Sequence, residues 1–246
     1  MKATQVAIVT GASRGIGAEI AKHLARDGYQ VVVNYASNAA EADKVVQDIA
    51  VAGGKSIAIK ANVADAAEVA ALFDAAEKAF GKIDVLVNNA GVMPSHLPVL
   101  ADTDDKAFDN MVAINIKGTF NTLRLAAKRM EQGGRIVNLS TSIVGTTLPG
   151  YSVYGATKAA VETMSQIFAK ELRGRAIRVN VVAPGPIATE LFLAGKTPER
   201  IEALSKMPPL ERLGQPDDVA KTVSFLVGEQ SGWVNGQVLR VNGGLV

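Results

Sequence analysis

The sequence predicts an α/β protein with a doubly wound parallel sheet, and three observations support this fold class. Short runs rich in Val and Ile alternate with helix-like stretches along the whole chain, the pattern of repeated βα units. These runs are apolar at successive positions, as in strands covered by helices on both faces. Hydrophobic residues make up 48% of the 246 residues, enough for one sizeable core. We find no linker or low-complexity segment, so we expect a single domain over residues 1–246.

Seven strands are expected, each a short apolar run bounded by turn residues. In chain order they lie at residues 6–9, 30–34, 56–59, 83–87, 135–139, 177–182 and 237–241. The expected helices lie between and after them, at residues 16–27, 39–52, 66–80, 103–130, 154–173 and 216–228. Parallel strands need crossovers of this kind, so the strands should form one seven-stranded sheet flanked by helices.

One long stretch, residues 184–215, does not follow the alternation. Its candidate helices are short, at residues 189–194 and 198–207. A segment this long inside a compact domain is usually a functional loop. We therefore expect a substrate lid around residues 187–213, with a purely structural excursion as the alternative.

Composition excludes several classes of function. The chain has 26 Lys and Arg against 24 Asp and Glu, a net charge of +2 without clusters, so no nucleic-acid partner is expected. It has no Cys and two His, His23 and His96, which argues against a metal site and a cysteine nucleophile. The longest uncharged stretch, residues 136–157, is rich in polar residues, and the start lacks a signal-peptide pattern. We expect no membrane partner and a cytoplasmic location.

A glycine-rich turn joins the first strand to the first helix. Gly11, Gly15 and Gly17 are spaced Gly-x3-Gly-x-Gly. Glycine lets a backbone approach a diphosphate closely, and a helix N-terminus offers free N–H groups and a positive dipole end. The turn therefore indicates a nucleotide site, the alternative being an ordinary strand-to-helix turn.

Tyr154 and Lys158 are four residues apart, so they share one face of the expected helix. An ammonium group near a phenol favours the phenolate, so we expect Lys158 to lower the pKa of Tyr154 and make it a general acid or base. Ser142, just after the fifth strand, can polarise a carbonyl with its hydroxyl. Alone, such a pair on an exposed helix is common.

The spacing Gly-x3-Gly-x-Gly resembles that of the short-chain dehydrogenase/reductase family. Four further segments match in order, and the resemblance extends from residue 6 to residue 244. These segments are Asn88-Asn89-Ala90-Gly91, Asn115, Ser142 with Tyr154-x3-Lys158, and Pro184-Gly185. The resemblance implies an NAD(P)-dependent oxidoreductase with a Rossmann sheet, commonly assembled as a tetramer.

The resemblance also assigns roles within the site. It implies that Ser142 holds the substrate carbonyl, Tyr154 donates the proton and Lys158 holds the nicotinamide ribose. Asn115 would support a water that links Lys158 to solvent. The implied cofactor-binding residues are Gly11, Ser13, Arg14, Gly15, Ile16, Gly17, Asn34, Ser37, Asn38, Asn62, Val63, Asn89, Ala90, Gly91, Tyr154, Lys158, Pro184, Gly185, Ile187 and Thr189.

Three adjacent hydroxyls compete for the serine's role. Relatives commonly carry Gly three residues after the serine, and Gly145 therefore selects Ser142 over Ser140 and Thr141. The interval to the tyrosine is then one residue shorter than in many relatives, so the loop of residues 145–153 should be tightened. Tyr151 has Gly, not a base, four residues later.

The residues after the second strand predict NADPH rather than NADH. An NAD site needs a carboxylate there, which would repel a 2′-phosphate, and residues 28–40 contain no Asp or Glu. Arg14 can reach the 2′-phosphate from one side, and Ser37 and Asn38 from the other. The alternative is that Arg14 is only a solvated loop residue.

The likeness is greatest to NADPH-dependent aldehyde and ketone reductases and extends to 3-oxoacyl-carrier-protein reductases. Apolar lid residues favour a hydrophobic carbonyl substrate; they are Leu191, Phe192, Leu193, Met207 and Leu210. A carrier protein would want a basic patch, but Glu131 follows Lys128 and Arg129, so we prefer a small free carbonyl. The remaining alternatives are a non-catalytic dinucleotide-binding protein and a lyase or epimerase.

Assembly is predicted from the last strand, residues 237–241, which ends the chain and should lie at a sheet edge. Exposed apolar edges are normally covered. In the family a partner subunit packs there, and the helix at 154–173 packs against its symmetry mate. We expect a homotetramer, with a dimer as the alternative.

Overall fold

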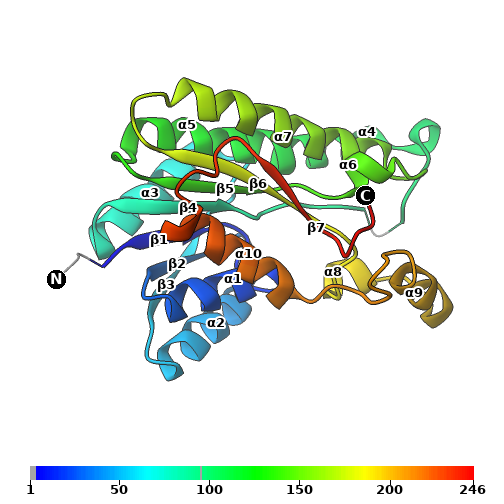
Figure 1. Cartoon of the computed structure of the whole chain (residues 1–246), viewed down its shortest axis with the longest axis horizontal. Coiled ribbons are helices and arrows are strands. Elements are labelled where there is room, and N and C mark those ends of the chain that lie inside the picture. The colour runs from blue at the N-terminus through cyan, green and yellow to red at the C-terminus, as the bar shows by residue number, and fades with distance from the viewer. Residues whose placement is uncertain (1–3, 95) are drawn as a thin grey trace.

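The computed structural model describes residues 4–94 and 96–246, so the first three residues of the predicted domain lie outside it. Its centre is a seven-stranded parallel sheet in the order β3-β2-β1-β4-β5-β6-β7, with helices on both faces (Figure 1). The strands are β1 (Val6–Val9), β2 (Gln30–Tyr35), β3 (Lys55–Lys60), β4 (Ile83–Asn88), β5 (Arg135–Leu139), β6 (Arg178–Pro184) and β7 (Val238–Val241). The predicted fold class is confirmed, and β7 lies at an edge as expected.

Alternate strand residues feed two separate cores. Ala7 and Val9 of β1 belong to the core under α1 (Gly15–Arg26), α2 (Ala39–Val51) and α10 (Pro216–Val227). Ile8, between them, belongs to the core on the other face, under α3 (Ala66–Phe80), α5 (Thr119–Arg129) and α7 (Ser152–Glu171). Side chains of a strand alternate between faces, so both faces of an apolar run are buried.

Several helices begin at a short polar residue whose side chain caps the helix N-terminus. Asp65 accepts hydrogen bonds from the N–H groups of Ala67 at 2.7 Å and Glu68 at 3.0 Å and so caps α3. Asn38 caps α2 in the same way through Glu41. Such caps satisfy backbone donors that the helix leaves free.

The helix expected over residues 103–130 is divided into sections. A one-turn 3-10 helix (Leu100–Asp102) precedes α4 (Asp105–Met111), and a π-helical section, Val112–Gly118, joins α4 to α5. The hydroxyl of Thr119, the first residue of α5, donates to the carbonyl of Asn115 in this section at 2.9 Å. A π turn holds an extra residue, and such turns are frequent at functional sites.

The segment predicted as a lid carries two short helices, α8 (Glu190–Leu193) and α9 (Pro198–Ser205), which follow β6 beyond the carboxyl ends of the strands (Figure 1). Two further short elements were not predicted, α6 (Ile143–Thr146) and a 3-10 turn at Glu229–Ser231. Within the described part of the chain, no helix has the length and apolar character needed to cross a membrane.

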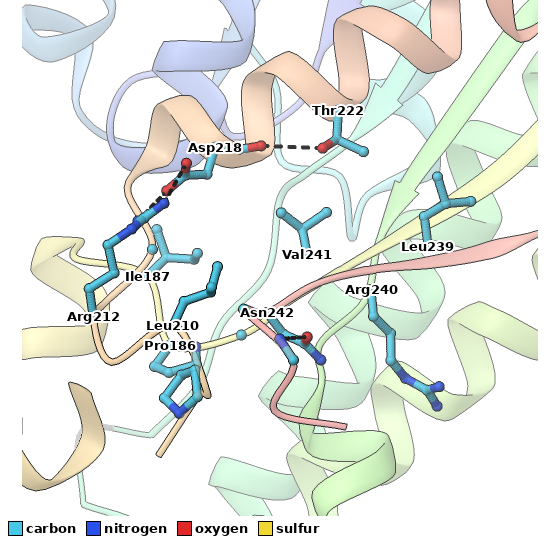
Figure 2. A pocket seen from close by; sticks show the side chains of 15 residues that line it. Pro186, Ile187, Leu210, Arg212, Asp218, Thr222, Leu239, Arg240, Val241 and Asn242 are labelled. Carbon is cyan, nitrogen blue, oxygen red and sulfur yellow. Dashed lines mark hydrogen bonds and ion pairs between the residues drawn. The ribbon is translucent and has the colours of Figure 1, made fainter. Parts of the chain in front are cut away.

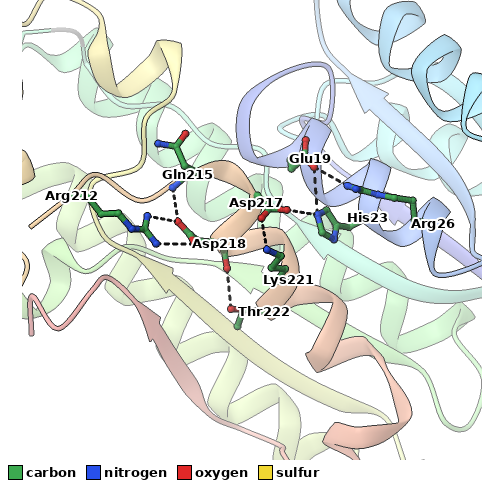
Figure 3. Close-up of polar contacts among 9 residues, drawn as sticks. All are labelled: Glu19, His23, Arg26, Arg212, Gln215, Asp217, Asp218, Lys221 and Thr222. Carbon is green, nitrogen blue, oxygen red and sulfur yellow. Dashed lines mark hydrogen bonds and ion pairs between the residues drawn. The ribbon is translucent and has the colours of Figure 1, made fainter. Parts of the chain in front are cut away.

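A polar cluster joins α1 to α10 away from the glycine turn (Figure 3). His23 lies 2.7 Å from a carboxylate oxygen of Asp217 and 3.4 Å from one of Glu19. These three side chains are close enough to hold a metal ion, but Arg26 and Lys221 already pair with the two carboxylates. The cluster therefore has a sufficient structural role, because the hydrogen bond between His23 and Asp217 links the two helices.

Candidate active site

The glycine turn lies against the end of β4, and the close approach explains its composition. Gly11 has a φ of +61°, and a Cβ there would come within 2.8 Å of Ala90 Cα. A Cβ on Gly17 would come within 2.4 Å of the Asn89 side-chain nitrogen. Asn89 donates from that nitrogen to the carbonyls of Thr10 and Gly11, both at 2.9 Å. The predicted turn and the predicted Asn-Asn-Ala-Gly segment therefore support each other directly.

Two buried polar side chains hold the turn from behind. The Thr10 hydroxyl accepts from the N–H groups of Asn89 and Ala90 at 3.1 Å. Asn34, predicted among the cofactor residues, is 1% exposed and accepts from the N–H of Gly11 at 3.3 Å. Its amide nitrogen donates to the carbonyl of Ala61 at 3.0 Å. Asn34 thus fixes the turn, and contact of its side chain with a ligand stays a prediction.

The first turn of α1 is left open. Its N-cap residue, Arg14, makes no side-chain cap, and the first turn contains no acidic residue. Arg14 instead pairs with Glu190 of α8 at 3.0 Å, with both side chains more than half exposed. A Cβ on Gly15, whose φ is +57°, would meet Thr189 at 3.6 Å. The turn and the start of the segment predicted as a lid therefore face each other across the end of the sheet.

The remaining residues predicted around the second and third strands lie near this edge. Asn62 is exposed and accepts from the N–H of Ala64 at 3.0 Å. Val63 is buried, and its carbonyl accepts from the Asn121 side chain at 3.0 Å. Ser37 is exposed, and Asn38 is held by its cap on α2. None of these positions contradicts the predicted site.

Asn115 is fully buried and locked by three hydrogen bonds. Its side chain accepts from the N–H of Val92 at 2.8 Å and donates to the carbonyl of Val92 at 3.0 Å and the hydroxyl of Thr157 at 3.1 Å. The π-helical section points this side chain inward. A Cβ on Gly91 would lie 3.2 Å from the Lys158 ammonium and 3.3 Å from the Asn115 amide oxygen. Gly91, Asn115 and Lys158 are thus brought together as the sequence suggested.

Lys158 is 5% exposed, and its ammonium donates to the carbonyl of Leu139 at the end of β5, at 2.8 Å. Burial lowers the pKa of Lys158 to about 8, because a charged amine loses its hydration inside the protein. Its ordinary value is near 10.5. The group is therefore partly neutral just above neutral pH.

The expected lowering of the pKa of Tyr154 is wrong. Burial raises the pKa of Tyr154 to about 12, and a hydrogen bond with the Thr141 side chain partly opposes the rise. Tyr151, whose ring centre lies 6.5 Å away, contributes a further small rise. Desolvation of the phenolate decides the direction of the shift, and the ammonium of Lys158 is bonded to the Leu139 carbonyl instead. Tyr154 is thus a protonated phenol at neutral pH, ready to donate.

The three hydroxyls after β5 have different partners. Ser140 donates to a carboxylate oxygen of Glu162 at 2.6 Å. Ser142 donates to the carbonyl of Ala183 at 3.1 Å and accepts from the Asn242 side chain at 3.0 Å. Asn242 was missed by the sequence reasoning, since it lies 100 residues from Ser142 without a local signal.

A mostly apolar cavity of about 130 Å³ opens in front of Tyr154. It takes residues from the glycine turn, the end of β5, the residues after β6 and the lid. They are Ile16, Met93, Ser140, Thr141, Ser142, Ile143, Leu148, Tyr151, Tyr154, Pro184, Gly185, Pro186, Ile187, Thr189, Leu191, Phe192, Leu204, Met207 and Leu245. Two of the four predicted catalytic residues, Ser142 and Tyr154, therefore line this cavity, with three of the five predicted apolar lid residues, which are Leu191, Phe192 and Met207.

A larger pocket of about 460 Å³ lies behind Pro186 and Ile187, between β7, α10 and the returning lid segment (Figure 2). Some of the polar side chains that line this pocket are already hydrogen-bonded to protein groups. Arg212 donates to Asp218 at 2.7 and 3.0 Å, and Thr222 donates to the Asp218 carbonyl at 3.2 Å. Leu210, one of the predicted lid residues, lines this pocket and not the cavity at Tyr154.

The comparisons with known proteins agree with this geometry. The family described as enoyl-(acyl carrier protein) reductase matches residues 11–246. A short-chain type dehydrogenase/reductase of Picea abies is 50% identical over 98% of this chain and 92% of that protein. An NADPH-dependent aldehyde reductase-like protein, chloroplastic, of Arabidopsis thaliana is 46% identical over 99% of this chain and 95% of that protein.

The solved structures agree as well. A short chain dehydrogenase from Burkholderia cenocepacia in complex with NADP is 35% identical, with a TM-score of 0.93. The likeness covers 100% of this chain and 99% of that one. The protein is therefore an NAD(P)-dependent oxidoreductase of the short-chain dehydrogenase/reductase family.

Proposed function

We propose that this protein is an NADPH-dependent carbonyl reductase that converts an aldehyde or ketone to the alcohol. The observation that carries the proposal is the cavity in front of Tyr154, where a protonated phenol meets apolar walls. The balanced reaction is carbonyl plus NADPH plus a proton giving alcohol plus NADP⁺. When bound, the dinucleotide supplies the hydride, and Tyr154 gives its proton to the carbonyl oxygen.

The residues present fit a dinucleotide. The uncapped start of α1 offers backbone N–H groups to a diphosphate, and the positive φ values of Gly11 and Gly15 let the backbone approach it closely. Lys158, close to Gly91 and Asn115, would hold the nicotinamide ribose. The residues Pro184, Gly185, Ile187 and Thr189 would line the nicotinamide side, and Ser13 and Ile16 the turn.

NADPH is proposed over NADH because the residues after β2 carry no acid and Arg14 is near. The pair between Arg14 and Glu190 is exposed on both sides, so it costs little to exchange Glu190 for a phosphate. The Arabidopsis thaliana relative is named for NADPH, and the Burkholderia cenocepacia structure holds NADP.

A second candidate is reduction of a 3-oxoacyl thioester on a carrier protein, the activity named for a Staphylococcus aureus relative that is 42% identical over 100% of this chain and 99% of that protein. Arg129, one of two cations considered for that docking, is bound to Asp74 at 2.7 Å and to Glu77. It is therefore less available to an acidic partner. Another cation, Lys196, lies 4.6 Å above the ring of Phe192, which lines the cavity.

The test is a panel of aldehydes, ketones, diketones and acetoacetyl thioesters with NADPH, followed by loss of absorbance of the reduced nicotinamide. We expect oxidation of NADPH with small carbonyls, abolished or slowed ~10²-fold in Tyr154→Phe. Faster turnover of the thioesters would favour the second candidate. No turnover of any member of the panel would refute a carbonyl reductase and leave the non-catalytic, lyase and epimerase alternatives.

We also propose a homotetramer in solution. Ile167 of α7, the helix expected to meet its mate, is 50% exposed, and Phe120 of α5 is 45% exposed. Trp233, just before the edge strand β7, is fully exposed. Burial of these groups by partner subunits would remove that apolar surface from water.

A further inference from the structure

An ion pair between Arg14 and Glu190 joins the glycine turn to α8, the first helix of the segment predicted as a lid. We propose that Glu190 competes with the 2′-phosphate of NADPH for Arg14 and thereby limits the preference of the site for NADPH over NADH. This inference rests on the proposed function, in which Arg14 contacts that phosphate. It adds a specificity-determining residue that lies on α8 and not at the end of β2.

The backbone is held in place on both sides of the pair. Arg14 is the N-cap residue of α1. The hydroxyl oxygen of Thr189, the N-cap residue of α8, accepts from the N–H of Phe192 at 3.2 Å. The N–H of Ala188 donates to the carbonyl of Gly214 at 2.8 Å and so fixes the approach to α8. Arg14 can therefore exchange partners by rotation of its own side chain and that of Glu190.

The pair is weak enough to be exchanged. Both side chains are more than half exposed, and one hydrogen bond joins Nη1 of Arg14 to Oε2 of Glu190 at 3.0 Å. Exposed pairs of this kind contribute little, because water solvates both charges well. A guanidinium can bind a phosphate through two parallel hydrogen bonds, and a phosphate monoester carries more negative charge than a carboxylate. The 2′-phosphate should therefore displace Glu190, but it must do so against a partner already in place.

The position of this acid gives it an effect on the choice of cofactor. In an NAD site the discriminating carboxylate follows the second strand, and residues 28–40 contain no Asp or Glu. Glu190 is 176 positions away from Arg14 in the sequence, yet its carboxylate reaches the guanidinium from α8. While paired, Glu190 offsets the positive charge that attracts the phosphate, and once displaced it is a like charge close to it. NADH carries no 2′-phosphate, so this competition does not affect it.

The experiment measures binding without substrate. Fluorescence of the reduced nicotinamide gives the dissociation constants of NADPH and NADH, which differ only in the 2′-phosphate. Glu190→Gln keeps the size of the side chain and removes its charge. It should lower the Kd of NADPH about two- to fivefold, the scale expected for an exposed ion pair, and leave the Kd of NADH unchanged. The gain should shrink at about 1 M salt, because salt screens exposed charges.

Two further variants separate the competition from other effects of charge. In an Arg14→Ala background, Glu190→Gln should leave both dissociation constants unchanged, because the contested cation is gone. Glu202→Gln on α9 is the matched control. It removes the same charge from an exposed carboxylate that pairs with Lys206 at 2.6 Å, and it should leave the ratio of the two constants at the wild-type value.

The proposal is overturned if Glu190→Gln leaves the ratio of the two constants unchanged, or if its effect persists in the Arg14→Ala background. Failure of the underlying function has a different signature. The wild type would then bind NADH as tightly as NADPH, and Arg14→Ala would not alter the ratio, which would refute the NADPH assignment and the competition together. A preference for NADPH that depends on Arg14 but not on Glu190 would refute only the role of Glu190.

Discussion

Lys158 should make the ligand-free protein less stable at neutral pH, and Lys158→Met tests this. Burial moves the pKa of Lys158 from 10.5 to about 8. At ~1.4 kcal/mol for each pKa step, the buried ammonium costs about 3 kcal/mol at about pH 7. Met fills the same space without charge but loses the bond to the Leu139 carbonyl, a cost of about 1 kcal/mol. The Met variant should therefore be about 2 kcal/mol more stable at about pH 7 and almost inactive.

The direction in which the free energy of unfolding changes with pH follows from the lowered pKa of Lys158. Because the pKa of Lys158 is lower in the folded state, the unfolded chain binds more protons between pH 8 and pH 10.5, and wild-type stability gains in that window. The advantage of the Met variant should thus shrink by about 2 kcal/mol between about pH 7 and about pH 9.5. Tyr154 stays neutral across this range and does not interfere. Urea unfolding of the ligand-free protein at several pH values measures the difference. A variant that is less stable than the wild type at pH 7, or a difference independent of pH, would refute the reasoning.

Four other outcomes are expected. Arg14→Ala should lower kcat/KM for NADPH ~10- to 150-fold and leave NADH nearly unchanged, and an equal effect on both cofactors would disprove the phosphate contact. Thr146→Val should raise the free energy of unfolding by up to about 1 kcal/mol, because its buried hydroxyl lacks a partner among the described residues. Phe73→Ala should cost about 3–5 kcal/mol in urea unfolding, because the ring is fully buried on α3. Light scattering should give four copies at working concentration; a monomer would contradict the proposed assembly.

The regular parts of the fold were open to sequence reasoning because their signals are local. Strands such as β4 and helices such as α3 follow from the alternation of short apolar runs with helix-like stretches, and each lies within a residue or two of its expected range. The π-helical section was not predicted, because a pattern of period 3.6 over residues 103–130 contains no mark of one extra residue. The four-residue α6 is too short for periodicity to be measured.

In the site, as in the fold, local signals could be predicted from the sequence and contacts between distant residues could not. The spacing of Tyr154 and Lys158 and the order of the motifs brought the right segments together. The choice among Ser140, Thr141 and Ser142 could not be made safely from spacing, because it depends on partners far along the chain. The bond from Asn242 to Ser142 spans 100 residues. The pKa of Tyr154 was predicted in the wrong direction for a related reason, because burial depends on the folded structure and not on the residues adjacent in the sequence.

The π-helical section sets how the site residues on this continuous helix are rotated about its axis relative to the core residues of α5. An α-helix turns about 100° per residue, so loss of one residue between Val112 and Gly118 would rotate everything on one side of the deletion by about that angle. Either Asn115 would swing away from Val92 and Thr157, or Leu123 and Ala126 of α5 would leave the core. A substitution in this segment changes only local contacts, whereas an insertion or a deletion rotates one whole side of the helix. The length of this segment is therefore under a stricter constraint than its composition.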